Sequence, residues 1–257
     1  MPLPSFHQTS PEGVEAAFIQ AFQRIRDKGF LPSHRLHNTG IGKTFEDHLE
    51  VIENNTPGPD FGHIEVKTQR ALTGSYITLF TKSPDFPAGA NRMLRDRFGT
   101  LVEAYGVRKL HTSFFAHRPN SLRGEYAFQL VLDDVGERLH IRVVRLDTGE
   151  VETTEPYWNY ATLQSSLETK LGHVAVIGAT TRREGEMEYF HFNHLRLLRS
   201  KGFDTFLRLV REGIVMFDIR IGFYKSGPSL GNPHDHGSGF RIRKGDLSLL
   251  FDTVYEE

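Results

Sequence analysis

Three charged residues that lie close together in the sequence could perform metal-dependent hydrolysis. Four residues separate Asp60 from Glu65, and Lys67 follows two positions later. Glu65 and Lys67 alternate with Ile64 and Val66, a pattern typical of a strand, so both charged side chains should point to the same face. Carboxylate oxygens suit Mg²⁺, and a neighbouring ammonium group can orient a water molecule. Such a set could hydrolyse a phosphodiester.

The elements around these residues must bring them together. Asp60 follows a Pro- and Gly-rich turn at 57–59, which could bend its carboxylate onto the face of the strand. Upstream, Glu46 lies in a segment whose apolar residues recur at helical spacing. His48 and His63 flank the acids, and we interpret His63 as the solvent-facing residue of its strand. An ordinary solvated strand also carries alternating charges, so the spacing alone leaves that structural interpretation open.

Several segments resemble one nuclease family in their amino-acid sequences and in their order along the chain. They include I-E-V-K-T and H-D-H-G-S-G-F-R-I, and they lie at 39–47, 53–55, 59–61, 64–68, 79–84, 89–99, 218–227 and 234–242. These segments are similar to the MvaI/BcnI family of restriction endonucleases, which belongs to the PD-(D/E)xK nucleases and is related to the nicking enzyme MutH. The resemblance implies a mixed α/β (α+β) fold with a PD-(D/E)xK core, in a two-lobed MutH-like architecture with a DNA-binding cleft.

The resemblance also implies roles for the acidic residues and the lysine. Asp60, Glu65 and the backbone carbonyl of Val66 would bind Mg²⁺, and Lys67 would position the attacking water. Glu46 would tune the site or bind a second ion. We expect Mn²⁺ to substitute for Mg²⁺ and Ca²⁺ to support DNA binding without cleavage.

The carboxy-terminal third carries residues suited to reading bases. Asp218 and Arg220 share one face of a predicted strand, and these types can recognise cytosine and guanine. From the residues alone, the loop that follows could also be a surface loop with a buried His. A zinc site in this loop is disfavoured because His234 and His236 are only two residues apart and, without cysteine, would need distant ligands. The resemblance implies that this region contacts DNA, with candidates Asp218, Arg220, His234, Asp235, His236 and Arg241. Lys82 would contact a phosphate, although an exposed lysine at a strand end fits as well.

The activity implied by the resemblance is that of a type II restriction endonuclease. Such an enzyme would act as a monomer on double-stranded DNA at C-C-N-G-G and nick the two strands in turn. The likeness to the MvaI side of the family favours C-C-W-G-G cut after the second C, with C-C-S-G-G as the alternative. A MutH-like nicking enzyme and a catalytically silent, sequence-specific DNA-binding protein are the other candidates. A cognate methyltransferase is expected in the host, without a stable complex.

Composition limits the other possibilities. The chain has 257 residues, of which 38% are hydrophobic and 25% charged, and it contains no cysteine, so disulfides and thiolate metal sites are excluded. We expect no membrane association and a cytoplasmic location, because no apolar run or signal-type pattern is present. The net charge of −1 gives no general argument for nucleic-acid binding. Residues 92–123, however, hold seven Lys or Arg against two acids, which suits either a phosphate backbone or a solvated surface.

Periodicity predicts the order of elements. We expect a helix from Pro11 to near Gly29, then a loop over 30–43, the helix carrying Glu46, and later helices over 90–105, 159–171, 203–211 and 247–251. We expect strands around Glu65 and over 76–80, 110–116, 125–132, 139–146, 174–179, 189–195, 215–224 and 239–243. The predicted division places a catalytic lobe at 1–118 and a sheet-rich middle with the DNA-recognition lobe at 119–257.

Overall fold

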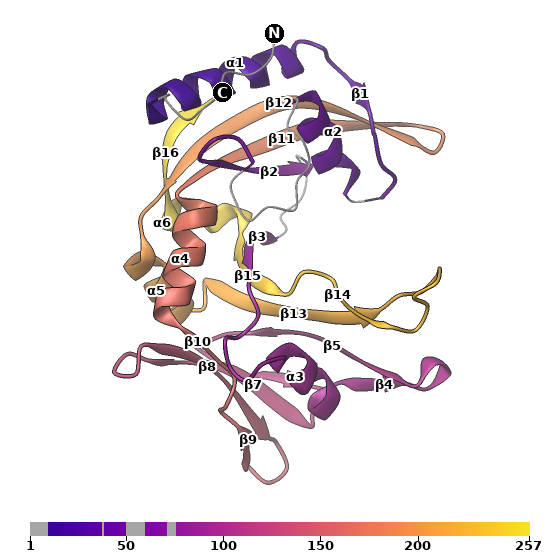
Figure 1. Ribbon diagram of the computed structural model, residues 1–257, viewed down its shortest axis with the longest axis vertical. Helices are drawn as coiled ribbons and strands as arrows, with labels where there is room; N and C mark the ends of the chain where they lie inside the picture. The colour runs from indigo at the N-terminus through magenta and orange to yellow at the C-terminus, as the bar shows by residue number, and fades with distance from the viewer. Residues whose placement is uncertain (1–9, 38, 50–59, 71–75) are drawn as a thin grey trace. The chain divides into compact units, whose positions relative to one another are not determined.

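The computed structural model describes residues 10–37, 39–49, 60–70 and 76–257. These residues belong to two compact units, each assembled from separate stretches of the chain (Figure 1). The first unit takes residues up to 74, 168–201 and 251–257, and the second takes 75–167 and 202–250. The division falls inside one helix, α4 (Tyr160–Leu171). The predicted turn at 57–59 and the matching segment at 53–55 lie outside the described residues.

The first unit is built on a five-stranded sheet in the order β1-β12-β11-β2, with β16 pairing β12. Its strands are β1 (Leu31–Pro32), β2 (Ile64–Arg70), β11 (His173–Glu184), β12 (Met187–Ser200) and β16 (Phe251–Glu256). β2 runs parallel to β11, with Glu65 opposite Val174, whereas the remaining pairs are antiparallel. The strands predicted at 174–179 and 189–195 are therefore the two arms of one long hairpin.

Two helices cover one face of this sheet. α1 (Pro11–Arg26) begins at Ser10, whose side chain accepts a hydrogen bond from the amide of Gly13, and α2 (Gly40–His48) follows β1. Their apolar residues share one buried cluster with Ile64, Val66 and the matching residues of β11 and β12. Because side chains alternate along a strand, Glu65 and Lys67 lie on the opposite face of β2. The apolar cluster thus fixes which way the predicted catalytic residues point.

The second unit contains two further sheets. One has the order β3-β15-β13-β5-β4, with β14 pairing β13, and comprises β3 (Tyr76–Thr81), β4 (Thr100–Val102), β5 (Val107–Phe114), β13 (Val215–Phe223), β14 (Pro233–Asp235) and β15 (Gly239–Arg243). The other has the order β10-β8-β7-β6, with β9 pairing β8, and comprises β6 (Asn120–Leu122), β7 (Tyr126–Asp133), β8 (Arg138–Arg145), β9 (Val151–Thr153) and β10 (Tyr157–Asn159). Its helices include α3 (Ala90–Phe98), α5 (Phe203–Arg211) and α6 (Leu247–Leu250), with short 3₁₀ turns at Glu103–Tyr105 and Lys244–Asp246.

The core of the second unit is aromatic. Trp158 packs edge-on against Phe217 and Phe240, with ring centroids 4.7 and 5.2 Å away. All three side chains are fully buried, and the indole nitrogen of Trp158 donates to the carbonyl of Lys82. This bond satisfies the polar end of a buried Trp and fixes the backbone after β3.

Several predicted elements are wrong in extent, and two of the differences have a local cause. The helix expected over 90–105 ends at Phe98, because Gly99 is extended and residues 100–102 pair with 107–109. Strand pairing at the sheet edge outweighs helical propensity there. The loop expected over 30–43 contains β1 and the first turns of α2, a helix that begins at Gly40. A Cβ at Gly40 would lie 2.2 Å from the carbonyl oxygen of Arg35, so the tight approach that starts α2 requires glycine.

The two compact units differ in extent from the predicted division near residue 118. That division assumed one boundary along the chain, whereas β2 pairs with β11 more than a hundred residues later. The assignment of cleavage and DNA reading to particular lobes stays a prediction. Among the described helices, none is both long and apolar enough to span a bilayer.

Candidate active site and nucleic-acid interface

The acid–acid–lysine set converges beside the start of β2. Asp60 Oδ2 accepts a hydrogen bond of 2.8 Å from the backbone amide of Val66, which holds the carboxylate against the strand. Lys67 Nζ donates to Glu65 Oε1 at 2.5 Å, as expected for neighbours on one strand face. The structure therefore brings Asp60, Glu65 and Lys67 together, with Val66 between them.

A second lysine, which the sequence analysis missed, joins this cluster. Lys170 lies in the last turn of α4, and its Nζ donates to Glu65 Oε2 at 3.4 Å. Both oxygens of Glu65 therefore have a cationic partner. The two residues are 105 positions apart, so no local pattern in the sequence indicates their contact.

Burial affects the protonation of Asp60. Glu65 is only 6% exposed, and burial raises the pKa of Asp60 above its usual value. The hydrogen bond from the Val66 amide opposes this rise, the charge of Glu65 adds to it, and the charges of Lys67 and Lys170 lower the Asp60 pKa. Two carboxylates in a partly desolvated site repel each other, and a divalent cation with oxygen ligands relieves that repulsion. The donor set therefore fits Mg²⁺.

Glu46 lies where the sequence placed it, on α2. A Cβ at Gly42 would lie 3.4 Å from Thr68 Oγ1 and 3.6 Å from Glu46 Oε1, so this acid lies near the part of β2 that carries Thr68. Thr68 is on the face opposite to Glu65 and Lys67. The catalytic or second-ion role of Glu46 stays a prediction.

The interpretation of His63 as a solvent-facing strand residue is wrong. His63 precedes β2, in a tight turn closed by reciprocal backbone hydrogen bonds between Phe61 and Ile64. Its Nε2 is buried, and its ring contacts that of His173 with centroids 4.5 Å apart. The parallel pairing of β2 with β11 brings His173 there, which local periodicity does not predict. His48 ends α2, where burial and the charge of Lys28 lower its pKa.

The candidate base-reading arginines in the second unit share one carboxylate. Asp218 Oδ2 lies 3.1 Å from Arg241 Nε, without hydrogen-bonding geometry, and 3.7 Å from Arg220 Nε. Asp218 Oδ1 accepts from the hydroxyl of Ser113 on the neighbouring strand β5. The side chain of Arg241 is 12% exposed and that of Arg220 is 47% exposed. Arg220 is thus the more accessible of the two arginines, and Asp218 lies beside both.

Asp235 builds the turn after β14. Its Oδ1 accepts from the amides of Gly237 and Ser238 and from the Ser238 hydroxyl, and its Oδ2 accepts from Asn91 on α3. The Ser238 hydroxyl also accepts from the backbone amide of Arg220 at 2.8 Å. The polar groups of Asp235 are therefore engaged within the protein, and they position the strand that carries Arg220.

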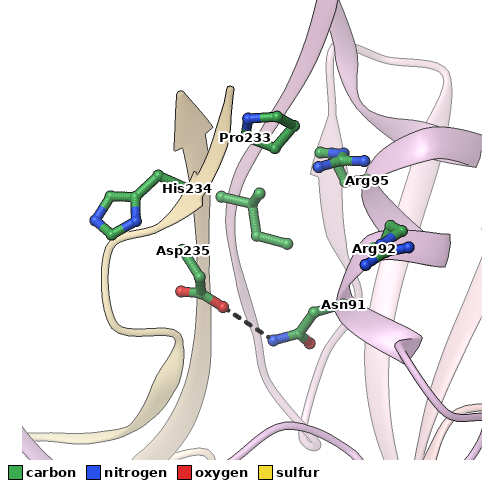
Figure 2. A pocket seen from close by; sticks show the side chains of 7 residues that line it. Asn91, Arg92, Arg95, Pro233, His234 and Asp235 are labelled. Carbon is green, nitrogen blue, oxygen red and sulfur yellow. Dashed lines mark hydrogen bonds between the residues drawn. The ribbon is translucent and has the colours of Figure 1, made fainter. Parts of the chain in front are cut away.

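A pocket of about 460 Å³ lies between α3 and β14 in this unit. Figure 2 shows Arg92 and Arg95 of α3 on one side and His234 and Asp235 on the other. Both arginines belong to the basic block at 92–123, and no local pattern in the sequence connects them with the loop at 233–238 that carries His234 and His236, the histidine loop. The fold makes that connection through the Asn91–Asp235 hydrogen bond.

The remaining candidates lie in the same loop or beside it. His234 stacks on Tyr224 with centroids 4.4 Å apart, and the His236 ring meets it edge-on at 4.6 Å. Burial, and then the charge of His234, lowers the pKa of His236. Lys82 lines a second pocket of about 360 Å³ with Asp235, and its Nζ lies 3.9 Å from Asp85. Lys82 thus lies beside the histidine loop.

The mixed α+β fold, with two acids and a lysine at the start of a helix-covered strand, is that of a PD-(D/E)xK nuclease. A sequence model of the MvaI/BcnI restriction endonuclease family matches residues 19–251. The chain belongs to the MvaI/BcnI restriction endonuclease family.

Two solved structures support this membership. A complex of restriction endonuclease MvaI with its cognate DNA substrate is 37% identical, covers 93% of this chain and 96% of its own, and gives a TM-score of 0.87. Restriction endonuclease MvaI in the absence of DNA is 35% identical, covers 98% of both chains, and gives a TM-score of 0.59. No curated protein matched in a separate search.

Proposed function

We propose that this chain is a Mg²⁺-dependent type II restriction endonuclease that cuts double-stranded DNA at C-C-W-G-G after the second C. The convergence of Asp60, Glu65 and Lys67, in a chain of a restriction endonuclease family, carries this proposal. The similar MvaI structure contains cognate DNA, which supports duplex DNA as the substrate.

The roles of the residues follow from their contacts. Asp60, Glu65 and the carbonyl of Val66 would hold the metal; when bound, Mg²⁺ makes water more acidic and offsets charge on the phosphate. Lys67 orients the attacking water, since its ammonium already lies at Glu65. The water oxygen forms a bond to phosphorus while the bond to the leaving oxygen breaks. Lys170 donates to the second oxygen of Glu65 and so fixes the orientation of that carboxylate.

Recognition would lie in the second unit. Arg220 reads guanine through the two major-groove acceptors of that base. Asp218, which lies beside both Arg220 and Arg241, orients the Arg220 side chain. Arg92, Arg95 and Lys82 contact phosphates beside the histidine loop. We further propose that the enzyme is a cytoplasmic monomer that nicks the strands in turn, accepts Mn²⁺, binds DNA without cleavage in Ca²⁺, and has a cognate methyltransferase as its counterpart in the host.

The test is digestion of a plasmid of known sequence with Mg²⁺, followed by run-off sequencing of both strands. Discrete cuts at C-C-W-G-G that vanish in Lys67→Ala are expected, while Lys201→Ala, which removes a lysine paired with exposed Asp252, should cut normally. Cuts at C-C-S-G-G would overturn the proposed central base pair of the recognition sequence, but not the proposed mechanism of cleavage. Normal cleavage by Lys67→Ala would overturn the active site itself.

A further inference from the structure

A second cluster of ligand-type side chains lies near the acidic site but on the helix-covered side of the sheet. It consists of Glu15 on α1, His63 in the turn before β2, and His173 at the start of β11. Each offers one ligand atom, and these atoms all lie within 4.8 Å of one another. Among the described residues, this is the one cluster of three or more such groups.

The strand register separates this cluster from Glu65 and Lys67. His173 is opposite Ile64 and points to the same face as Ala175 and Ile177, which pack in the apolar cluster under α1 and α2. Glu65 and Lys67 point to the other face. The two sets of ligands therefore lie on opposite sides of β2.

Direct contacts within the protein do not satisfy the hydrogen-bonding atoms of this cluster. His173 Nε2 lies 3.6 Å from Glu15 Oε1, beyond ordinary hydrogen-bond distance. His63 Nε2 is buried without a hydrogen-bond partner, although a buried polar nitrogen normally has one. A metal ion that accepts electron pairs from all three side chains would account for both observations.

The chemistry of the three donors selects the ion. Two imidazoles and one carboxylate suit Zn²⁺ and similar transition metals, whereas Mg²⁺ prefers oxygen ligands alone. In a tetrahedral zinc site with bonds of about 2.0–2.1 Å, ligand atoms are about 3.3–3.5 Å apart. The 3.6 Å between His173 and Glu15 is already close to that spacing. Burial, followed by the charge of His63, lowers the pKa of His173, which favours the neutral ring that binds metals.

We propose that Glu15, His63 and His173 bind one Zn²⁺-type ion, separate from the Mg²⁺ site, which joins α1 to the turn before β2. His63 is three residues after Asp60 and two before Glu65. A metal on His63 therefore fixes the segment that presents both acids. Three protein ligands leave a fourth position for water.

The test is a calorimetric titration of ZnCl₂ into the chelator-treated full chain, in a large excess of Mg²⁺ that occupies the carboxylate site. One equivalent of Zn²⁺ should bind, and the melting temperature should rise with Zn²⁺ concentration. His63→Gln and His173→Gln should each weaken binding by at least about tenfold, since even second-shell changes at metal sites have that effect. Co²⁺ in place of Zn²⁺ should give visible absorption bands in the wild type that both variants lose.

His34→Gln is the matched control. His34 also contacts a second histidine, His48, and a carboxylate, Asp47, at 2.8 Å, but these groups are not within reach of one ion. This variant should bind Zn²⁺ like the wild type. If a histidine variant fails to fold, Glu15→Gln, which keeps the size of the side chain, should show the same weakening. Absence of Zn²⁺ binding, or equal binding by all variants, would overturn the proposal and leave a bridging water as the explanation.

Discussion

The acidic cluster on β2 and the candidate base-reading region on β13–β15 are assembled in different ways. Asp60, Glu65 and Lys67 lie within eight consecutive residues, and the alternation of one strand places two of them side by side. The base-reading region combines a strand at 215–223, a loop at 233–238 and the helix α3 more than a hundred residues earlier. The three proposed cleavage residues are thus local in sequence, and the proposed recognition residues are not.

The carboxylates also differ in what they do. In the acidic cluster, burial raises the pKa of Asp60, and the oxygen donors suit the proposed divalent cation. In the second region, Asp218 and Asp235 accept hydrogen bonds from the protein's own hydroxyl, amide and backbone groups. Acids in two matching motifs therefore have different surroundings: the one on the β2 side is proposed as a metal ligand, and Asp218 lies beside two arginines.

The largest effect is expected at Asp60. Asp60→Ala should lower the single-turnover cleavage rate by at least about 100-fold, because it removes a proposed metal ligand. DNA affinity measured with Ca²⁺ should change little. Asp27→Ala, which removes an exposed acid paired with Arg26, is the control and should cleave normally. Unimpaired cleavage by Asp60→Ala would show that the acidic cluster is not the catalytic site.

Arg220→Ala should reduce discrimination between cognate and single-substituted sites by about 1–3 kcal/mol, the usual value of a bidentate contact to guanine. Competition binding on a set of duplexes, each with one base pair changed, measures this quantity. Arg208→Ala removes an arginine of similar exposure that pairs with Glu212 on α5, and should discriminate like the wild type. An equal loss of affinity for all duplexes would instead make Arg220 a phosphate contact.

Asp235→Ala should destabilise the fold by about 1–2 kcal/mol, because two backbone amides and two side chains lose their acceptor. Binding should weaken on all sequences alike. Urea unfolding measures the first effect and the same set of duplexes the second. Asp235→Asn keeps an oxygen acceptor and should recover most of the stability. A change confined to one base pair would show that Asp235 reads DNA directly.

Glu188→Gln should cost about 1 kcal/mol of stability at neutral pH, as it breaks a partly buried bidentate pair with Arg70 at the end of β2. Hydrogen bonds from Arg70 lower the Glu188 pKa below its usual 4.5. The contribution is therefore present above that value and is lost as pH falls through the lower, folded-state pKa.

Urea unfolding at several pH values measures this effect. Glu184→Gln, on the same hairpin but 55% exposed, should show little change. A pH-independent difference between Glu188→Gln and the wild type would contradict the ion-pair explanation.

The smallest effect is expected for Lys170→Met, less than about tenfold on the cleavage rate, because this ion pair is partly exposed. Since Lys170 lowers the Asp60 pKa, its removal should shift the acid limb of the rate profile to higher pH. Single-turnover rates across pH measure the shift. An unchanged pH profile would show that Lys170 does not affect the pKa of Asp60, so that only charges within residues 60–67 act on it.

The sequence by itself determined the elements whose pattern is short-ranged. The helix at 203–211 and the strand at 239–243 have the predicted bounds, because hydrophobic periodicity within a few residues specifies them. The same alternation predicted that Glu65 and Lys67 meet. Matching segments along the chain also indicated the family, which the comparison with its sequence model confirmed.

Only the tertiary structure decided which distant residues meet. The contact of Lys170 with Glu65, the support of Arg220 by the turn at Asp235, and the approach of His173 to His63 all depend on pairings between separate segments. Helix α3 ended early for the same reason, since strand pairing at 100–102 prevailed over the local pattern. Such contacts depend on the free energy of packing the whole chain, which no short stretch of sequence encodes.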